Sequence, residues 1–304
     1  MSVYPLFPAC KDYLWGGHRR LRENFGIESS LEPLAEAWVL SCHPDGPSRL
    51  ADGTTLPELV QREGKVILGE NCQHFEEFPL LVKLIDAQQS LSIQVHPSDE
   101  YALAHEGQYG KTEMWIVLDA DKDAFIYYGF DHEISREEFS RRIGDKTLTQ
   151  VLHKAPAKKD DVFFIPSGTL HAIGAGLVIA EIQQNSNVTY RVFDYDRRGP
   201  DGKPRALHVE KALEVTSRKP VSPVDFSPHL GKCPFFTTDR YEGSFSLRCG
   251  PDSFHALLVT RGEGELRCGK EDFPIKAGGC FFLTAGSGEY EVNGDCQTLV
   301  IYVS

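Results

Sequence analysis

Short apolar runs, rich in β-branched and aromatic residues and bounded by turn residues, constrain this chain more than any other feature. Clear examples are Trp115–Leu118, Ala124–Tyr128, Val162–Ile165 and Leu177–Ile182. Runs of this length and composition are typical of β-strands, and a succession of them predicts a sandwich or a barrel. We therefore expect an all-β-dominated fold with jelly-roll barrels.

Helical patterns are few in this sequence. Ser135 followed by Glu138 resembles a capping box and predicts a helix that runs to about Lys154. Two shorter segments, Leu56–Val66 and His208–Ser217, also have helical patterns. The sequence thus predicts a β-rich protein with a small number of helices.

A weak internal repeat points to two related barrels. Asp161–His171 aligns with Gly279–Glu289, and Glu113–Leu118 aligns with His255–Thr260. The two segments occur in the same order in both copies, with an offset of 142 residues for Glu113–Leu118 and 118 for Asp161–His171, and this shared order favours a duplication over chance. We therefore expect two barrels that descend from one.

The two barrels are expected to differ in function. The first copy has His171 where the second has Glu289, so we expect only the first to keep an active site. The proline-rich stretch 219–234 is the predicted linker. This gives a catalytic domain at residues 1–218 and a structural barrel without a metal site at residues 219–304.

Composition narrows the class of protein. The 304 residues carry a formal charge of -12, which argues against a broad nucleic-acid-binding surface. No stretch approaches the ~18 apolar residues of a membrane span, and the first residues do not resemble a signal peptide. The eight cysteines form no C-x-x-C pair and no evident disulfide framework. We therefore expect a cytoplasmic protein with reduced thiols, whose partner is a small molecule rather than a nucleic acid or a membrane.

Four side chains of the kinds that bind metals occur in three predicted β-segments. Gln94 and His96 are two residues apart, so they share one face of a strand that Pro97 ends. Glu113 precedes an apolar strand, and His171 follows a tight turn of small residues. Each residue alone has an ordinary structural explanation. Together, two imidazoles, a carboxylate and an amide oxygen predict a site for one divalent cation, with zinc (Zn2+) the first choice.

Several motifs resemble the signatures of type I phosphomannose isomerases. They lie in the first two thirds of the chain: Leu14–Gly17, Glu36–Pro44, Gln94–Pro97, Gly110–Glu113, Pro166–Ala172 and Gln184–Arg191. The resemblance implies a zinc-dependent cupin enzyme, in the compact bacterial form, that interconverts mannose 6-phosphate and fructose 6-phosphate. It also implies that Gln94, His96, Glu113 and His171 bind the metal. The C-terminal third has no motif that we match to this family.

The same resemblance implies that Arg191 is catalytic and that Lys111 lies in the pocket. Arg191 stays protonated and could stabilise an enediolate, whereas its ordinary alternative is an ion pair with Asp194 or Asp196. Lys111 could hold the phosphate or move a proton. Glu181, on the strand after His171, is a candidate base, although it could instead orient Arg191 or a ligand.

Two other functions compete with the isomerase. An iron-dependent cupin dioxygenase usually has more histidine ligands, and Gln94 fits it poorly. A non-catalytic sugar-binding cupin would not require Glu113, His171 and Arg191 together. The donor set also accepts manganese, cobalt or iron, and the sequence does not give an oligomeric state.

Overall fold

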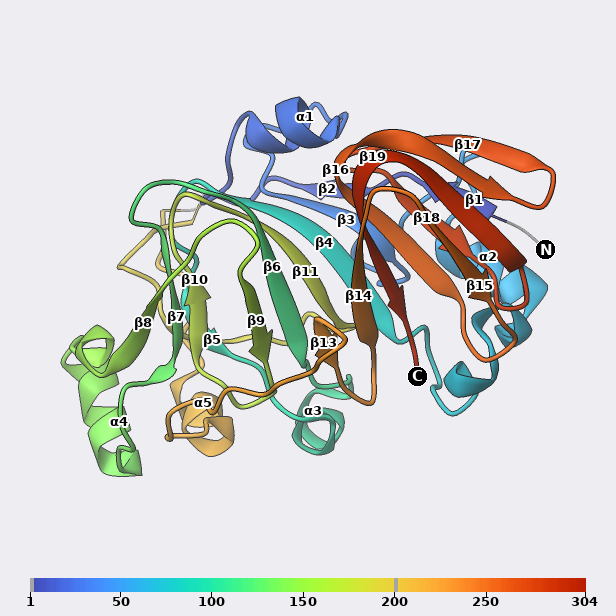
Figure 1. The fold of residues 1–304 in the computed structure, drawn as a ribbon. Helices are drawn as coiled ribbons and strands as arrows, with labels where there is room; N and C mark the ends of the chain where they lie inside the picture. The colour runs from blue at the N-terminus through green and yellow to red at the C-terminus, as the bar shows by residue number, and fades with distance from the viewer. Residues whose placement is uncertain (1–2, 200–201) are drawn as a thin grey trace. The chain divides into compact units, whose positions relative to one another are not determined.

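The computed structural model describes residues 3–199 and 202–304, which form mainly antiparallel strands (Figure 1). The all-β-dominated fold predicted from the sequence is confirmed. Contacts along the backbone divide the chain into two units. The first comprises residues up to Asp12, His18–Leu84 and Asp225–Ser304, and the second comprises Tyr13–Gly17 and Ile85–Val224. The division predicted at residues 218 and 219 stays a prediction; the C-terminal segment of the first unit begins a few residues later.

The first unit contains one large antiparallel sheet in the order β1-β18-β16-β19-β14-β13, with β15 beside β19 and β17 beside β16. Its strands are β1 (Val3–Leu6), β2 (Ala9–Lys11), β3 (Glu36–Ser41), the first part of β4 (Leu80–Ala87), β13 (Gly231–Lys232), β14 (Thr237–Glu242), β15 (Phe245–Cys249), β16 (His255–Cys268), β17 (Glu271–Lys276), β18 (Cys280–Leu283) and β19 (Gly288–Tyr302). Its helices are α1 (Arg20–Phe25), α2 (Leu56–Glu63), η1 (Lys65–Leu68) and η2 (Glu70–Cys72).

The second unit contains the residues of the predicted site. One sheet has the order β12-β5-β10-β7-β8. In another sheet, strands β4, β11, β6 and β9 are neighbours in that order, and of β4 only the part from Ile85 onward belongs to this unit. Its further strands are β5 (Ile93–Val95), β6 (Glu113–Ala120), β7 (Phe125–Phe130), β8 (Leu152–Pro156), β9 (Val162–Ile165), β10 (His171–Ile173), β11 (Leu177–Gln184) and β12 (Tyr190–Phe193). Its helices are α3 (Asp99–Glu106), α4 (Arg136–Gly144), η3 (Leu148–Gln150) and α5 (Val209–Val215).

The predicted helices exist, but one is shorter than expected. The Ser135 hydroxyl accepts a hydrogen bond from the Glu138 backbone N–H, as a helix N-cap does. Helix α4 then ends at Gly144 rather than near Lys154, because the chain turns there, with Lys146 at a φ of 60°. No helix in the described part of the chain has the length and hydrophobicity that crossing a bilayer requires.

One face of the five-stranded sheet in the second unit is apolar. Ile93, Val95, Ala172 and Val192 belong to a buried cluster with residues of α4 and α5, and these helices lie at one end of the unit's strands in Figure 1. Because side chains alternate along a strand, the residues between them face the other way. The helices thus bury one face of this sheet, and the other face is left to carry polar groups.

The internal repeat is visible in the pairing of strands. In the second unit, β6 pairs with β9 so that Glu113 lies opposite Ile165. In the first unit, β16 pairs with β18 so that His255 lies opposite Leu283. These are the positions that the sequence alignment makes equivalent. The same register in both pairs supports an origin by duplication.

Candidate metal centre and active site

A row of polar side chains crosses the face of the five-stranded sheet that the helices leave uncovered. His171 on β10 lies directly opposite Gln94 on β5 and Tyr128 on β7, and Gln94 lies opposite Arg191 on β12. Residues that lie opposite each other on neighbouring strands share a face of the sheet. Arg191, Gln94, His171 and Tyr128 therefore form one row, and His96 follows Gln94 one residue beyond the end of β5.

A second set of polar groups comes from strands β6 and β11. Glu113 lies opposite Gln183, and Trp115 lies opposite Glu181. All four side chains are buried, with Glu113 and Gln183 fully excluded from solvent. A carboxylate in such a place is costly unless it has a charged partner or a bound cation. Two buried carboxylates on neighbouring strands are typical of a functional site.

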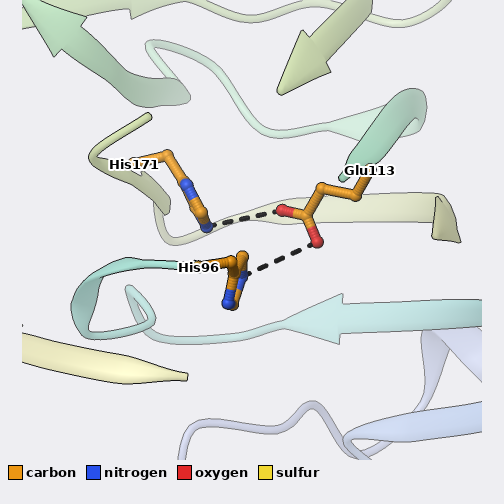
Figure 2. A group of neighbouring side chains, drawn as sticks. All are labelled: His96, Glu113 and His171. Atoms are coloured by element: carbon orange, nitrogen blue, oxygen red, sulfur yellow. Dashed lines mark ion pairs between the residues drawn. The ribbon is translucent and has the colours of Figure 1, made fainter. Parts of the chain in front are cut away.

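His96, Glu113 and His171 converge from three strand ends (Figure 2). The Nε2 of His171 lies 3.4 Å from one Glu113 carboxylate oxygen, and the Nε2 of His96 lies 3.8 Å from the other. The possible ligand atoms of all three residues lie within 4.8 Å of one another, and all three side chains are buried. This spacing and chemistry match what one small divalent cation requires.

Both histidines have the tautomer that a metal ligand needs. The Nδ1 of His96 bonds the carbonyl oxygen of Val188 at 2.8 Å, and the Nδ1 of His171 bonds that of Thr169 at 2.8 Å. A carbonyl oxygen only accepts, so each Nδ1 carries the proton and each Nε2 carries the lone pair. Burial lowers the pKa of His171 to about 4, so its imidazole is neutral at pH 7. The Nε2 of His171 is buried and makes no hydrogen bond to the described residues.

Lys111 lies between the two buried carboxylates. Its Nζ is 2.5 Å from Glu113 Oε2, 3.5 Å from Glu181 Oε1 and 3.4 Å from His96 Nε2. The side chain is 5% exposed. Two carboxylates and one ammonium leave one excess negative charge in a place that water hardly reaches. A divalent cation would compensate that charge, so the residues fit a metal ion electrostatically as well as geometrically.

Glu181 is held by Trp115. The indole Nε1–H donates a hydrogen bond to Glu181 Oε2 at 2.9 Å, and the other carboxylate oxygen is the one that faces Lys111. The Trp115 ring also meets the His171 imidazole edge-on, with ring centres 5.3 Å apart. Glu181 thus lies in the same buried cluster as the predicted metal ligands, where a carboxylate could accept or deliver a proton.

Arg191 does not form the ion pair that we considered as its alternative role. Arg197 and Arg205 contact the carboxylate of Asp194, and Lys146 contacts that of Asp196. Arg191 instead donates to the backbone oxygen of Ala206 at 3.0 Å, and its buried Nε has no hydrogen-bond partner among the described residues. Burial lowers the pKa of its guanidinium, which nevertheless stays charged.

The structure therefore brings five of the seven predicted residues into direct contact. His96, Glu113, His171, Lys111 and Glu181 form one connected cluster. Gln94 and Arg191 occupy the same sheet face as His171. The usual strand spacing puts the backbone of Arg191 about 10 Å from that of His171.

The sequence reasoning missed Trp115, Gln183 and Tyr128. Trp115 and Gln183 each lie two residues after a polar site residue on the same strand, so the period of two could have identified both. Tyr128 has no such signal, because it joins the row only through the pairing of β7 with β10.

Comparisons with known proteins identify the family of this chain. Residues 3–122 match the model of the catalytic domain of type I phosphomannose isomerase, and residues 229–303 match that of the mannose-6-phosphate isomerase cupin domain. Mannose-6-phosphate isomerase from Streptococcus mutans is 38% identical over 300 residues, covering 94% of this chain and 93% of that protein. ManA, the mannose-6-phosphate isomerase of Bacillus subtilis, is 36% identical over 323 residues, covering 100% of both.

Solved structures show the same relationship. The crystal structure of mannose 6-phosphate isomerase from Bacillus subtilis superposes with a TM-score of 0.92 at 33% identity, covering 100% of both chains. The cupin-type fold predicted from the sequence is thereby confirmed, as is the predicted family. This chain belongs to the type I phosphomannose isomerase family.

Proposed function

We propose that this protein interconverts mannose 6-phosphate and fructose 6-phosphate at a metal centre formed by His96, Glu113 and His171, with Gln94 as a fourth ligand. Membership of the family makes it an aldose–ketose isomerase. The observation that carries the proposal is the convergence of two buried imidazoles on one buried carboxylate in a chain of this family. Family membership favours the isomerase over a cupin dioxygenase and over a non-catalytic sugar-binding cupin.

Zinc is the metal that we propose, with one ion per chain. Imidazole nitrogen and carboxylate oxygen are common zinc ligands, and the amide oxygen of Gln94 would complete a set of four. When bound, the ion would polarise the oxygens of the sugar and stabilise negative charge on them. Manganese, cobalt and iron share the same ligand preferences, so reconstitution with each metal is part of the test.

The proton transfer is assigned to residues of the chain. Isomerisation removes a proton from C2 of the sugar and delivers one to C1. Glu181 is the proposed base, because its carboxylate is buried, oriented by Trp115 and close to Lys111. Lys111 is the proposed partner in moving the proton, and its position between two carboxylates favours that role over phosphate binding alone.

Arg191 is proposed to contact the substrate. Its guanidinium stays charged, and the Asp194 carboxylate forms its ion pairs with Arg197 and Arg205 instead, so Arg191 can stabilise the enediolate that forms during the reaction. Lys111 and Arg191 are the proposed substrate-binding cations for this anionic sugar. We further propose that the enzyme acts in the cytoplasm, which accords with its eight free cysteines.

Removal of the metal tests this proposal. The protein is incubated with mannose 6-phosphate, and fructose 6-phosphate is detected by a coupled assay before and after dialysis against a chelator. We expect turnover to be lost with the metal and restored by one equivalent of zinc per chain. Glucose 6-phosphate serves as the control substrate and should not be converted at a comparable rate. Unchanged turnover in protein shown to be free of metal would reject the proposal.

A further inference from the structure

The contact between Trp115 and Glu181 joins two strands inside the active-site cluster. The two residues lie directly opposite each other on β6 and β11, so their side chains emerge side by side on one face. Trp115 is 1% exposed and Glu181 is 4% exposed. The indole Nε1–H donates to Glu181 Oε2 at 2.9 Å, a good length for this bond.

This bond fixes the orientation of the carboxylate. An indole N–H only donates, and its bond to a charged carboxylate away from water is stronger than a neutral hydrogen bond. With Oε2 held by Trp115, Oε1 is the oxygen that faces Lys111, at 3.5 Å. The carboxylate plane is therefore set by two contacts from two different residues, one on each oxygen.

The same indole also contacts the metal centre. Its ring meets the His171 imidazole nearly at a right angle, at an interplanar angle of 82°. One rigid side chain thus packs against a proposed metal ligand and hydrogen-bonds to the proposed base. A side chain that only filled the core would need neither the contact with His171 nor the hydrogen bond to Glu181. A phenylalanine would fill much of the same space, but it could not donate the hydrogen bond.

We propose that Trp115 is a positioning residue of the isomerase reaction, which acts by aiming the carboxylate of Glu181 at the reacting carbons. This inference rests on the role proposed for Glu181. A reacting group that is displaced by about 1 Å can lose about 100-fold in rate, even when substrate binding is unchanged. The effect of Trp115 should therefore fall on kcat rather than on KM.

The test combines Trp115→Phe with Glu181→Gln in a double-mutant cycle. We expect Trp115→Phe to lower kcat by about 10- to 100-fold, with KM and metal content within about twofold of the unmodified protein. In the Glu181→Gln background, the same substitution should change the residual kcat by less than about twofold, because no base remains to be aimed. An equal loss of kcat in both backgrounds would mean that Trp115 acts only through packing, and would overturn the inference.

Two controls separate packing from positioning. Phe163 lies opposite Trp115 on the other neighbouring strand, β9, so Phe163→Leu removes aromatic bulk from the same row without removing a hydrogen bond to Glu181; its kcat should stay within about twofold. If Trp115→Phe folds poorly, benzothienylalanine at position 115 removes only the N–H and should give the same loss of kcat. A wild-type kcat in that variant would also overturn the inference.

The double-mutant cycle also tests separately the positioning role of Trp115 and the proposal that Glu181 is the base. If Glu181→Gln retains full turnover, Glu181 is not the base and the inference about Trp115 falls with it. If Glu181→Gln is nearly inactive while Trp115→Phe has an unchanged kcat, only the positioning role is wrong.

Discussion

Replacing His96 with alanine should remove the bound metal and reduce turnover by about 1000-fold, because a catalytic cation contributes several kcal/mol to the stabilisation of the transition state. The imidazole is fully buried, and the carbonyl oxygen of Val188 fixes its ring with Nε2 toward Glu113. Metal analysis of the purified variant, together with the coupled assay, measures both losses.

His105 provides a matched control for that substitution. Its Nδ1 also bonds a backbone carbonyl oxygen at 2.8 Å, that of Tyr101, but the side chain is exposed on helix α3 and lies outside the metal cluster. His105→Ala should keep both metal and turnover. A His96→Ala protein with a full complement of metal would contradict the ligand assignment.

Arg191→Ala should give the opposite combination, with metal retained and kcat reduced by about 100- to 1000-fold, the usual cost of losing one group that stabilises a developing oxyanion. The reason is its place in the sheet: Arg191 lies beside Gln94 on the face that carries His171, but it is not part of the cluster of His96, Glu113 and His171 whose possible ligand atoms converge. Metal analysis and steady-state kinetics on the same preparation separate binding of the metal from chemistry.

Two further variants sharpen the Arg191 result. Arg191→Lys keeps the charge but loses the planar fork of donors, and it should recover only part of kcat. Arg142→Ala removes an arginine of helix α4 that pairs with Glu138, and it should leave kcat unchanged. Loss of the metal in Arg191→Ala would show that the division between ligand and catalytic residue is wrong.

Patterns of neighbouring residues predicted the presence of helices and strands better than the residues at which they end. The N-cap at Ser135 depends on side-chain chemistry within three residues, so the sequence predicts where this helix begins. The end of that helix at Gly144 was missed, although Gly144 and Asp145 are turn formers, because the apolar pattern continues into the strand β8. Helix α3 was missed as well, despite Ser98 at its N-cap and acidic residues in its first turn.

Part of the proposed ligand set was predictable for a similar reason. Gln94 and His96 share a face because side chains alternate along a strand, and that rule needs no tertiary structure. The distance between His96 and Glu113 depends instead on how two sheets face each other, which spacing in the sequence does not determine. The prediction that His96 and Glu113 lie close together therefore came from their residue types and from the family resemblance.

The contact between Trp115 and Glu181 could not have been derived by counting residues. It depends on the register of β6 against β11, and that register shifts at an irregularity between Val178 and Ile179. A shift of this kind changes which residues lie opposite each other. Only the folded chain reveals that the indole and the carboxylate are neighbours.

X-ray diffraction from zinc-loaded crystals, measured on both sides of the zinc absorption edge, tests the central claim most directly. We predict one anomalous peak per chain, about 2.0–2.2 Å from Nε2 of His96, Nε2 of His171 and a carboxylate oxygen of Glu113. A peak at any other place, or no peak in crystals of protein that turns over substrate, would contradict the account.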